Sequence, residues 1–439
     1  VLVGSEGTLS LFNKIKLKLS EIPKKKILGV CYFEKFHEAM TLTREMVKLK
    51  PTTVELMDKN LLDLAKEIPI YADGIKKYVI GDPKAVLMVE FIDYDLNLIN
   101  KKIKDLENLV KSQNKNNNFS YFKEIKDQKE IFEIRKAGLN ILMSMKGDKK
   151  PVAFIEDCAV TLDHLAEYTT KLKEIFKKYD TSGMFYAHAS VGTLHVRPVL
   201  NMKSDKDINN MKKIAEEAFE MVKQYKGSHS GEHGDGIVRS EFHEKMFGKK
   251  IINAFEDVKD TFDHKNLLNP NKIVRPYKSN DRSLMRYKAD YKTEKISTHY
   301  DWSEWGQFSD AVEMCNNNGA CRKLDSGVMC PSYRVTKEEK DLVRGRANTL
   351  RLALSNQLPK GSFVSKEMYE SMELCVSCKA CQRECPMSVD IAKMKSEFLF
   401  HYYKKFNMSI KDKIICSLPK KIRFLKLLCV LYTSVGADE

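Results

Sequence analysis

The sequence contains no uninterrupted apolar stretch long enough to cross a membrane. A spanning helix needs about 20 consecutive apolar residues. The longest candidate, FLKLLCVLYTSV near the C-terminus, is interrupted by Lys426. We therefore predict that this stretch begins a packed helix within a helical segment at 406–439.

Export signals and nucleic-acid-binding motifs are also missing from the sequence. Without an export signal, the 11 cysteines indicate a reducing cytosol or organelle matrix, so we expect a cytoplasmic protein. The net charge of +15 could mark a nucleic-acid or anionic membrane surface, and a peripheral contact with the cytoplasmic face of the membrane stays open. The lysines alternate with glutamates, however, and no zinc-finger, RNP or helix-turn-helix pattern accompanies them. We favour a solvated surface and expect no nucleic-acid partner.

Both ends of the sequence predict a piece of a larger protein. Residue 1 is Val rather than Met, and the last residues run straight out of an apolar helix. We therefore expect an internal part of a longer chain.

Four cysteines near the C-terminal end carry the strongest motif. Cys375, Cys378, Cys381 and Cys385, followed by Pro386, have the spacing C-x2-C-x2-C-x3-C-P. This is the run that holds iron–sulfur clusters in two-cluster bacterial ferredoxins, where the fourth Cys reaches the neighbouring cluster. Structural zinc usually takes two separated Cys pairs instead. The motif predicts an electron-transfer domain.

An imperfect second half lies upstream. Cys315, Cys321 and Cys330 form it, but Asn318 stands where C-x2-C would need a thiol. Cross-ligation would place Cys330 with the first three downstream cysteines, and Cys385 with Cys315 and Cys321. The second cluster then has three thiolates, and its fourth iron has a non-Cys ligand or is absent, which gives a [3Fe–4S] form. The alternative is that the upstream thiols are merely buried.

The chain between residues 25 and 277 alternates short apolar strands with amphipathic helices. We predict an α+β fold with helices packed on an antiparallel sheet, followed by a mainly α-helical, ferredoxin-like iron–sulfur domain. The expected strands are 27–33, 85–93 and 151–160, with a hairpin over 184–200; a loop is expected at 114–118. The expected helices are 36–50, 96–113, 128–145, 162–179, 208–227 and, between the cluster motifs, 337–357. The expected domains are 25–277, a linker at 278–310, and the two-cluster domain at 311–405.

Four residues in two glycine-bearing loops predict a metal site. His188 and His195 flank ASVGTL, and a turn there would bring both imidazoles to one side. Glu232 and His233 lie in SHSGEHGDG, where small residues allow close approach to a ligand. Two His and one carboxylate with an open position form a catalytic metal set, which leaves His233 as a general base. The alternative is that each His only satisfies a hydrogen bond.

Four stretches resemble the signature loops of the FAD-linked D-2-hydroxyacid dehydrogenase family. They are GSEGTL at 4–9, HASVGTLH at 188–195, GEHGDG at 231–236 and NPNK at 269–272. That family includes D-lactate dehydrogenases, glycolate oxidase and D-2-hydroxyglutarate dehydrogenase. The resemblance covers residues 1–410, and the fused cluster segment is similar to the large members that join flavin and iron–sulfur domains.

The resemblance implies roles for particular residues. It implies a divalent metal, with zinc favoured, on His188, His195 and Glu232, with His233 as base and Arg135 as an anchor for the substrate carboxylate. We expect Arg197 to contact the same carboxylate, because a guanidinium matches it bidentately. The residues expected to line FAD are Gly4, Ser5, Glu6, Gly7 and Thr8, together with the segment from Asn269 to Lys272. Residues 1–24 would end the FAD-binding domain, so we expect this chain alone to bind FAD weakly or not at all.

The implied reaction is oxidation of a D-2-hydroxy acid to the 2-oxo acid. Electrons would pass from FAD through the clusters to a quinone or carrier protein. The sequence departs from the family in S-V-G-T between the metal histidines and in Asn271, which replaces the usual Gly. The departures affect the identity of the substrate more than the type of reaction. The alternatives are an iron–sulfur electron-transfer subunit without a substrate site and a catalytically dead scaffold.

Overall fold

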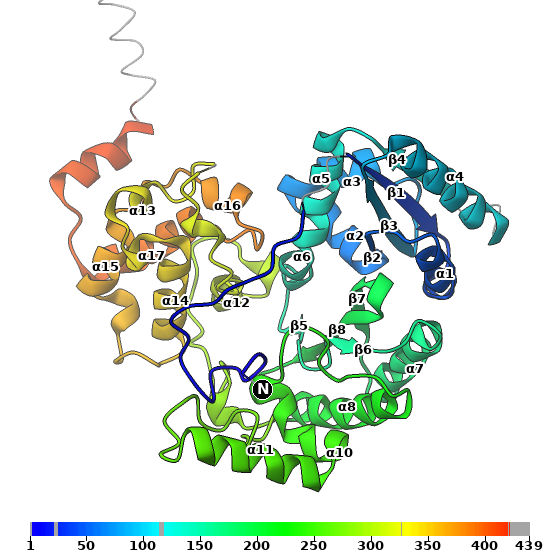
Figure 1. Cartoon of the computed structure of the whole chain (residues 1–439). Helices are drawn as coiled ribbons and strands as arrows, with labels where there is room; N and C mark the ends of the chain where they lie inside the picture. The colour runs from blue at the N-terminus through cyan, green and yellow to red at the C-terminus, as the bar shows by residue number, and fades with distance from the viewer. Residues whose placement is uncertain (1, 22–24, 114–117, 326, 420, 422–439) are drawn as a thin grey trace, which may run out of the picture.

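A single antiparallel sheet forms the centre of the first domain in the computed structural model of the chain (Figure 1). The structure describes residues 2–21, 25–113, 118–325, 327–419 and 421. The sheet order is β4-β1-β3-β2-β7-β8-β5, and β6 also pairs with β8. The strands are β1 (Lys25–Phe33), β2 (Thr53–Asp58), β3 (Ala85–Asp93), β4 (Asn118–Phe122), β5 (Lys149–Pro151), β6 (Cys158–Ala159), β7 (Gly183–His188) and β8 (Thr193–Asn201).

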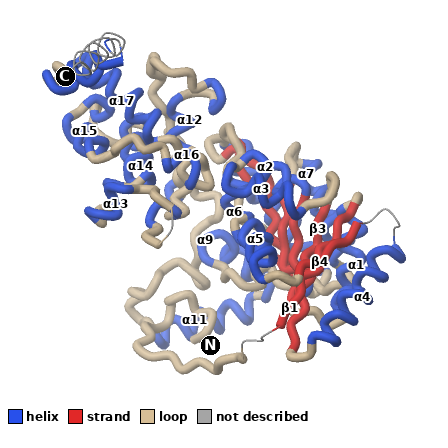
Figure 2. The backbone as a smooth tube through the Cα atoms, turned by 90° about the horizontal axis from the view of Figure 1, so that it is seen from above, coloured by secondary structure: helices blue, strands red, loops and turns tan. Residues whose placement is uncertain are grey.

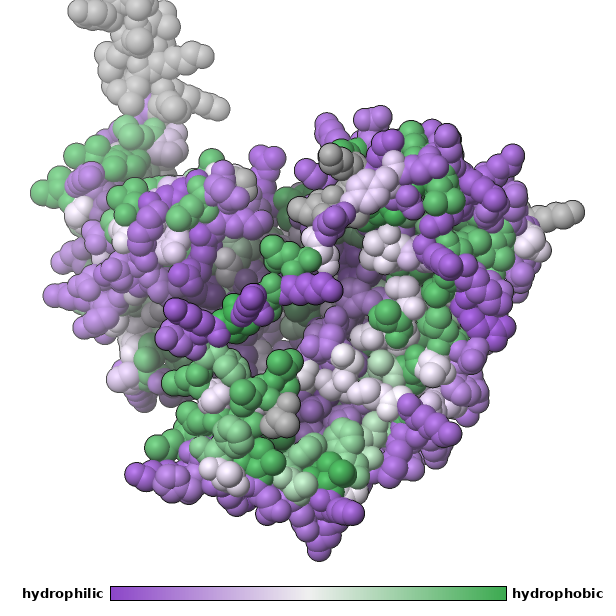
Figure 3. Space-filling view, viewed as in Figure 1, coloured by the Kyte–Doolittle hydropathy of each residue, from purple (hydrophilic) through white to green (hydrophobic). Residues whose placement is uncertain are grey.

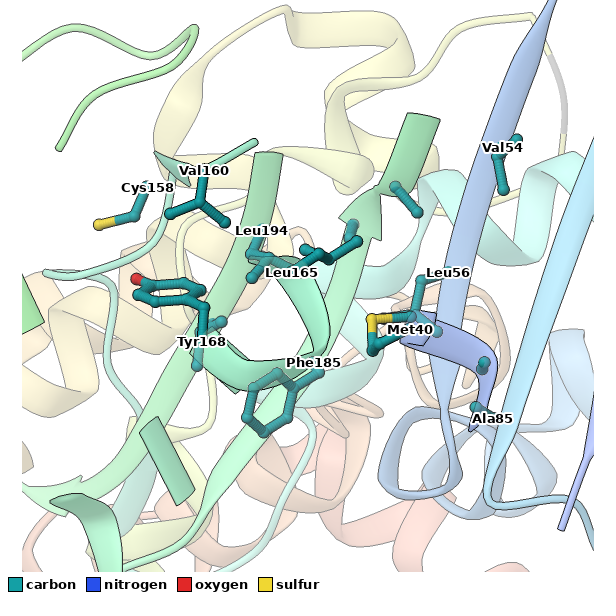
Figure 4. Close-up of a cluster of buried hydrophobic side chains, with 14 of the residues drawn as sticks. Met40, Val54, Leu56, Ala85, Cys158, Val160, Leu165, Tyr168, Phe185 and Leu194 are labelled. Atoms are coloured by element: carbon teal, nitrogen blue, oxygen red, sulfur yellow. The ribbon is translucent and has the colours of Figure 1, made fainter. Parts of the chain in front are cut away.

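Helices cover both faces of this sheet (Figure 2). The first-domain helices are α1 (Phe36–Lys48), α2 (Lys59–Glu67), α3 (Pro69–Tyr78), α4 (Leu96–Gln113), α5 (Ile125–Lys136), α6 (Gly138–Met143), α7 (Leu165–Lys178), α8 (Asp205–Gln224), α9 (Gly236–Arg239), α10 (His243–Phe247) and α11 (Lys249–Phe262). Side chains alternate along β1: Cys31 belongs to a core that includes residues of α1, α4, α7 and α8, whereas Val30 belongs to a core that includes residues of α2, α3, α5 and α6. Figure 4 shows part of the core that contains Cys31, with Met40, Leu56 and Phe185 among its buried side chains.

Most of the predicted elements are present, and the α+β prediction with an antiparallel sheet is confirmed. β1, β3, α4 and the β7–β8 hairpin follow their predicted ranges closely. The single helix predicted at 128–145 is wrong, because α5 and α6 divide at Ala137. The helix predicted at 337–357 is likewise shorter: α14 covers Val343–Leu354. The predicted loop at 114–118 lies largely outside the described residues, and Asn118 begins β4.

The strand predicted at 151–160 is wrong. Only Lys149–Pro151 and Cys158–Ala159 pair as strands there. Asp157 lies between these pieces with a φ of 78°, a left-handed conformation that interrupts extended pairing. In this conformation the Asp157 carboxylate points at the loop that carries Glu232 and His233.

The second domain is helical and packs around its own core. Its helices are α12 (Phe308–Glu313), α13 (Pro331–Thr336), α14 (Val343–Leu354), α15 (Lys366–Glu373), α16 (Ala380–Glu384) and α17 (Ile391–Lys405). Trp302, in the predicted linker, is buried in this core, and its indole nitrogen donates to Glu397 at 3.0 Å. Residues 410–419 are helical, whereas the apolar stretch at 424–435 lies outside the described residues.

Candidate metal and substrate site

The β7–β8 hairpin brings the two predicted metal histidines together. His188 ends β7 and Thr193 begins β8, with a short 3₁₀ turn at Ala189–Val191 between them. Gly192 has a φ of 70°, and a Cβ there would lie 1.9 Å from the carbonyl oxygen of Val160, so only glycine fits. The imidazole centroids of His188 and His195 are 5.0 Å apart. The predicted turn is therefore present and places both rings on one side.

Glu232 completes this group with one carboxylate oxygen. Its Oε1 lies 3.3 Å from Nε2 of His188 and 3.2 Å from Nε2 of His195. Ligands about 2.1 Å from a tetrahedral zinc would be roughly 3.4 Å apart. Glu232 is half exposed and His195 is buried, so the group is open on one side only. The three donors fit a single divalent ion with a free coordination position.

His233 lies beside the same group. Its ring stacks on His195 at a centroid distance of 5.0 Å and an angle of 10°. Its Nε2 is 3.4 Å from Oε1 of Glu232, and its Nδ1 is 3.7 Å from Glu156. His233 is thus near the potential metal position and remains partly exposed, where a substrate proton could reach it.

Asp157 holds the loop that carries Glu232 and His233. Its carboxylate accepts hydrogen bonds from the backbone nitrogens of Glu232 (2.9 Å) and His233 (2.8 Å) and from the hydroxyl of Ser230 (3.0 Å). Asp157 is fully buried. The role of Asp157 was not predicted, because the apolar pattern of residues 151–160 is that of a continuous strand.

Glu55 on β2 links His188 to Arg135. Its Oε1 lies 2.9 Å from Nδ1 of His188, and its Oε2 lies 2.8 Å from Arg135. A carboxylate on the second ring nitrogen orients a metal-binding histidine and fixes its tautomer. The sequence analysis missed Glu55 because β2 was not predicted. Arg135, the predicted substrate anchor, is buried, pairs with Glu55 and lies 4.8 Å over the Tyr186 ring.

Arg197 is also buried, and it forms an ion pair with Glu156. It donates to the Tyr186 hydroxyl at 3.4 Å. Its Nε has no hydrogen-bond partner within the described part of the chain. Arg197 also lines a cavity of about 370 Å³ together with Lys150, Arg286, Met314 and Asn318. Both arginines are buried and lie near His195, whose pKa their charges lower.

The protonation of the two histidines differs because their surroundings differ. Burial, reinforced by nearby cationic groups, lowers the pKa of His195 to about 2. The hydrogen bond that His188 donates to the Glu55 carboxylate raises the pKa of His188. His195 is therefore neutral at ordinary pH, and its lone pair is available to a metal ion.

The two segments expected to line FAD lie next to each other and to the GEHGDG loop. The Glu6 carboxylate accepts from the backbone nitrogens of Asp235 (2.5 Å) and Gly236 (2.9 Å). The Asn269 amide donates to the Glu6 carbonyl at 2.7 Å. Figure 3 shows apolar side chains gathered at the lower end of this face, over α11, and an adjoining cavity of about 370 Å³ is lined by Gly4, Ser5, Thr8 and Phe255, among others. Nζ of Lys272 lies 5.5 Å from the centre of the Tyr277 ring.

Candidate iron–sulfur sites

The seven motif cysteines separate into two groups. Cys330, Cys375, Cys378 and Cys381 line a single pocket. Cys315, Cys321 and Cys385 are near one another, since the charge of Cys315 helps to raise the pKa of both other thiols and the charge of Cys385 helps to raise that of Cys321. No three of these seven described thiols are close enough to share one metal ion. This grouping is the one that cross-ligation requires.

The three-thiol group faces the first domain. Arg286 donates to the Cys315 carbonyl at 3.0 Å, and the Asn316 amide lies 3.3 Å from Asn140 on α6. The charge of Cys385 also contributes to the raised pKa of Tyr71 on α3. In the four-thiol group, Cys378 is exposed.

Asn318 does not lie buried among these thiols. It is exposed, its side-chain oxygen accepts from the Ala320 nitrogen at 2.8 Å, and its amide donates to Asn316. Cys31 and Cys158 are buried and free, whereas Cys416 is exposed.

Comparison with known proteins

The chain belongs to the family described as "FAD linked oxidases, C-terminal domain", which matches residues 22–273. Residues 311–389 match the family described as "4Fe-4S dicluster domain". The protein is therefore built from an oxidase domain of the flavin-linked class and an iron–sulfur domain.

Curated relatives are similar to all or part of the chain. D-2-hydroxyglutarate dehydrogenase of Escherichia coli (strain K12) is 28% identical over 95% of this chain and 45% of its own length. The enzyme of the same name from Pseudomonas putida is 28% identical over 100% of this chain and 47% of its own length. Glycolate oxidase subunit GlcD of Bacillus subtilis is 27% identical over 62% of this chain and 56% of its own length. The chain thus spans about half the length of these relatives.

No helix among the described residues is long and apolar enough to span a membrane.

Proposed function

We propose that this chain carries the substrate site and the electron outlet of an FAD-dependent D-2-hydroxyacid dehydrogenase. The observation that carries the proposal is the convergence of His188, His195 and Glu232 on one point beside a partly exposed His233. The names of the relatives support the substrate class, which comprises D-2-hydroxyglutarate, D-lactate and glycolate.

His188, His195 and Glu232 would hold a divalent metal, with zinc favoured by the nitrogen and oxygen donors. When bound, such an ion would polarise the substrate hydroxyl and lower its pKa. His233 would then accept the hydroxyl proton, because its ring lies against the same carboxylate and retains access to solvent. Asp157 keeps the base in place by binding its backbone nitrogen.

Arg135 and Arg197 would supply positive charge for the substrate carboxylate. Each already pairs with a buried glutamate, Glu55 or Glu156. Direct binding of a substrate carboxylate would therefore require at least one arginine to use a donor other than the one in its present ion pair. Nε is such a donor, since it is buried without a hydrogen-bond partner in both arginines, as far as the described residues go.

FAD, when bound, would supply the two-electron oxidant for the α-carbon. We assign Gly4–Thr8 and Asn269–Lys272 to its site, since Glu6 and Asn269 fix these segments against the GEHGDG loop. Bound clusters would carry single electrons onward. The three-thiol site would come first, because it faces the oxidase domain, and the four-thiol site would deliver electrons to a quinone or carrier protein. A quinone as acceptor would place the protein on the cytoplasmic face of the membrane.

The test is an assay of the full-length protein that contains this chain, with a dye acceptor and D-lactate, glycolate or D-2-hydroxyglutarate. Bleaching of the flavin by one D-acid, and not by its L-enantiomer where one exists, is the expected result. Reduction of the clusters by an external donor without flavin bleaching by any of the three acids would favour the electron-transfer subunit instead.

A further inference from the structure

A second group of metal-binding side chains lies beside the first and shares no residue with it. His229, Asp235 and His243 offer donor atoms that converge. Nε2 of His229 is 3.1 Å from Oδ1 of Asp235, and Nε2 of His243 is 3.0 Å from Oδ2. The two histidines are 1% and 3% exposed. The oxidation mechanism proposed above uses none of these three side chains.

The converging atoms are close but do not form hydrogen bonds. Nε2 of His243, Oδ1 of Asp235 and both ring nitrogens of His229 are buried without a hydrogen-bond partner among the residues described. Buried polar atoms of this kind are nearly always paired, since leaving one unpaired is costly. Short distances without hydrogen-bond directions are expected when several ligands point at one shared cation rather than at each other.

The hydrogen bonding of His243 supports a cation at this point. Its Nδ1 lies 3.0 Å from the carbonyl oxygen of Ile273, and a carbonyl only accepts, so Nδ1 carries the hydrogen. A neutral ring then presents the lone pair of Nε2 to the Asp235 carboxylate, which is also an acceptor. A positive charge between them, either a metal ion or a proton on Nε2, removes this conflict. Metal-binding histidines commonly donate their second nitrogen to a backbone carbonyl in this way.

The surroundings leave little water around the two histidines. The His229 ring packs edge-on against Phe219 at 5.5 Å and lies tilted against Phe247 at 5.6 Å. A cavity of about 10 Å³ borders His229, which is barely enough space for one water molecule. The Asp235 side chain is 20% exposed, and no Lys or Arg of the described chain forms an ion pair with it.

We propose that His229, Asp235 and His243 bind a second divalent cation of the zinc class, with a structural role. The three residues belong to different local structures. His229 follows a backbone pairing between Ser228 and Ala159, His243 begins α10, and the nitrogen of Asp235 is bound to Glu6. A cation at this point would tie the GEHGDG loop to α10 and to the N-terminal segment.

The proposal is tested by counting zinc sites on the intact 439-residue chain. The clusters are first reconstituted anaerobically, so that the cysteines are occupied by iron, and Zn²⁺ is then titrated against a chromophoric chelator. We expect two zinc ions per chain for the wild type, one for Glu232→Gln, one for His243→Asn and none for the double variant. A count of one in the wild type, or an unchanged count in His243→Asn, would overturn the second site.

Two variants of His243 separate its role as a metal ligand from its hydrogen bond to Ile273. In His243→Asn, the amide can still donate to Ile273, but the ligand atom Nε2 is lost. In His243→Gln, the longer amide can reach toward Asp235. Both should lose the second zinc ion, and His264→Asn, at an exposed histidine, should keep it. If His243→Asn does not fold, as judged by circular dichroism, His229→Asn replaces it. Zinc should raise the melting temperature of the wild type more than that of His243→Asn. Equal rises in the two proteins would also contradict the proposal.

Discussion

The oxidase domain and the iron–sulfur domain arrange their candidate metal ligands in opposite ways. In the oxidase domain, Oε1 of Glu232 lies 3.3 Å from Nε2 of His188 and 3.2 Å from Nε2 of His195, and hydrogen bonds to the carboxylates of Glu55 and Asp157 hold this group. In the iron–sulfur domain, four of the candidate thiols line a space, but no three of the described thiols meet. The protein itself brings the first set of donors together, whereas we expect the second set to need its cofactor to connect them. Loss of metal should therefore affect the two domains unequally.

The largest effect is expected from Cys381→Ser in the four-thiol group. Cys381 is buried in the core of the second domain, so loss of its cluster should remove about four irons and destabilise that domain. Iron analysis and circular dichroism after anaerobic reconstitution check this, and Cys416→Ser, at an exposed thiol, is the matched control. Retention of all the iron in Cys381→Ser would contradict the grouping of the cysteines.

Removal of metal from the candidate site in the oxidase domain should leave the fold intact. The affinity of this site for zinc should depend on Glu55. Glu55→Gln keeps the size of the side chain but removes the charge that orients His188. Loss of such a supporting carboxylate costs roughly 10- to 100-fold in metal affinity. Competitive zinc titration measures this, and circular dichroism should show no change. An affinity equal to that of the wild type would mean that Glu55 does not position His188.

Within the iron–sulfur domain, the two groups should themselves differ in stability toward air. The group of Cys315, Cys321 and Cys385 has three thiolates, and Asn318 is exposed and occupied by local hydrogen bonds. We expect this cluster to lose an iron in air and convert to a [3Fe–4S] form, whereas Asn318→Cys should lengthen its lifetime several-fold. Electron paramagnetic resonance of air-exposed samples distinguishes the forms. Two equally air-stable clusters in the wild type would contradict the cross-ligation scheme.

The smallest effect concerns Lys150, in the cavity between the two domains. Burial lowers its pKa from the usual 10.5 to about 8. Between these values the unfolded chain binds the proton and the folded chain does not, so this lysine makes the protein more stable as pH rises from 8 to 10.5. After a discount for partial exposure, the gain should be about 1–2 kcal/mol and absent in Lys150→Met. Melting temperatures of both proteins at pH 8 and pH 10 provide the comparison, and equal pH dependence would contradict the assigned shift.

The sequence was sufficient for the elements with a regular apolar pattern, as β1, β3 and α4 show. The cysteine spacing also placed Cys330 with Cys375, Cys378 and Cys381, and these four side chains line one pocket. Their role as cluster ligands stays a prediction. Glu55, Glu156 and Asp157 could not be predicted in the same way. Glu55 meets His188 only because β2 pairs with β7, a contact between residues 133 apart in the chain. Asp157 reaches the GEHGDG loop only because its backbone leaves the extended conformation.

The metal role of Glu232 and the separate role of His233 are the central claim of the proposed function. The direct measurement is the content of bound zinc in Glu232→Gln and in His233→Ala, together with turnover of a D-2-hydroxy acid by the full-length protein. Glu232 contributes the oxygen that lies 3.2 Å from His195, whereas His233 is expected to act on the substrate proton. We predict that both variants lose turnover and that only Glu232→Gln loses zinc. Equal zinc content in the two variants would contradict the assignment.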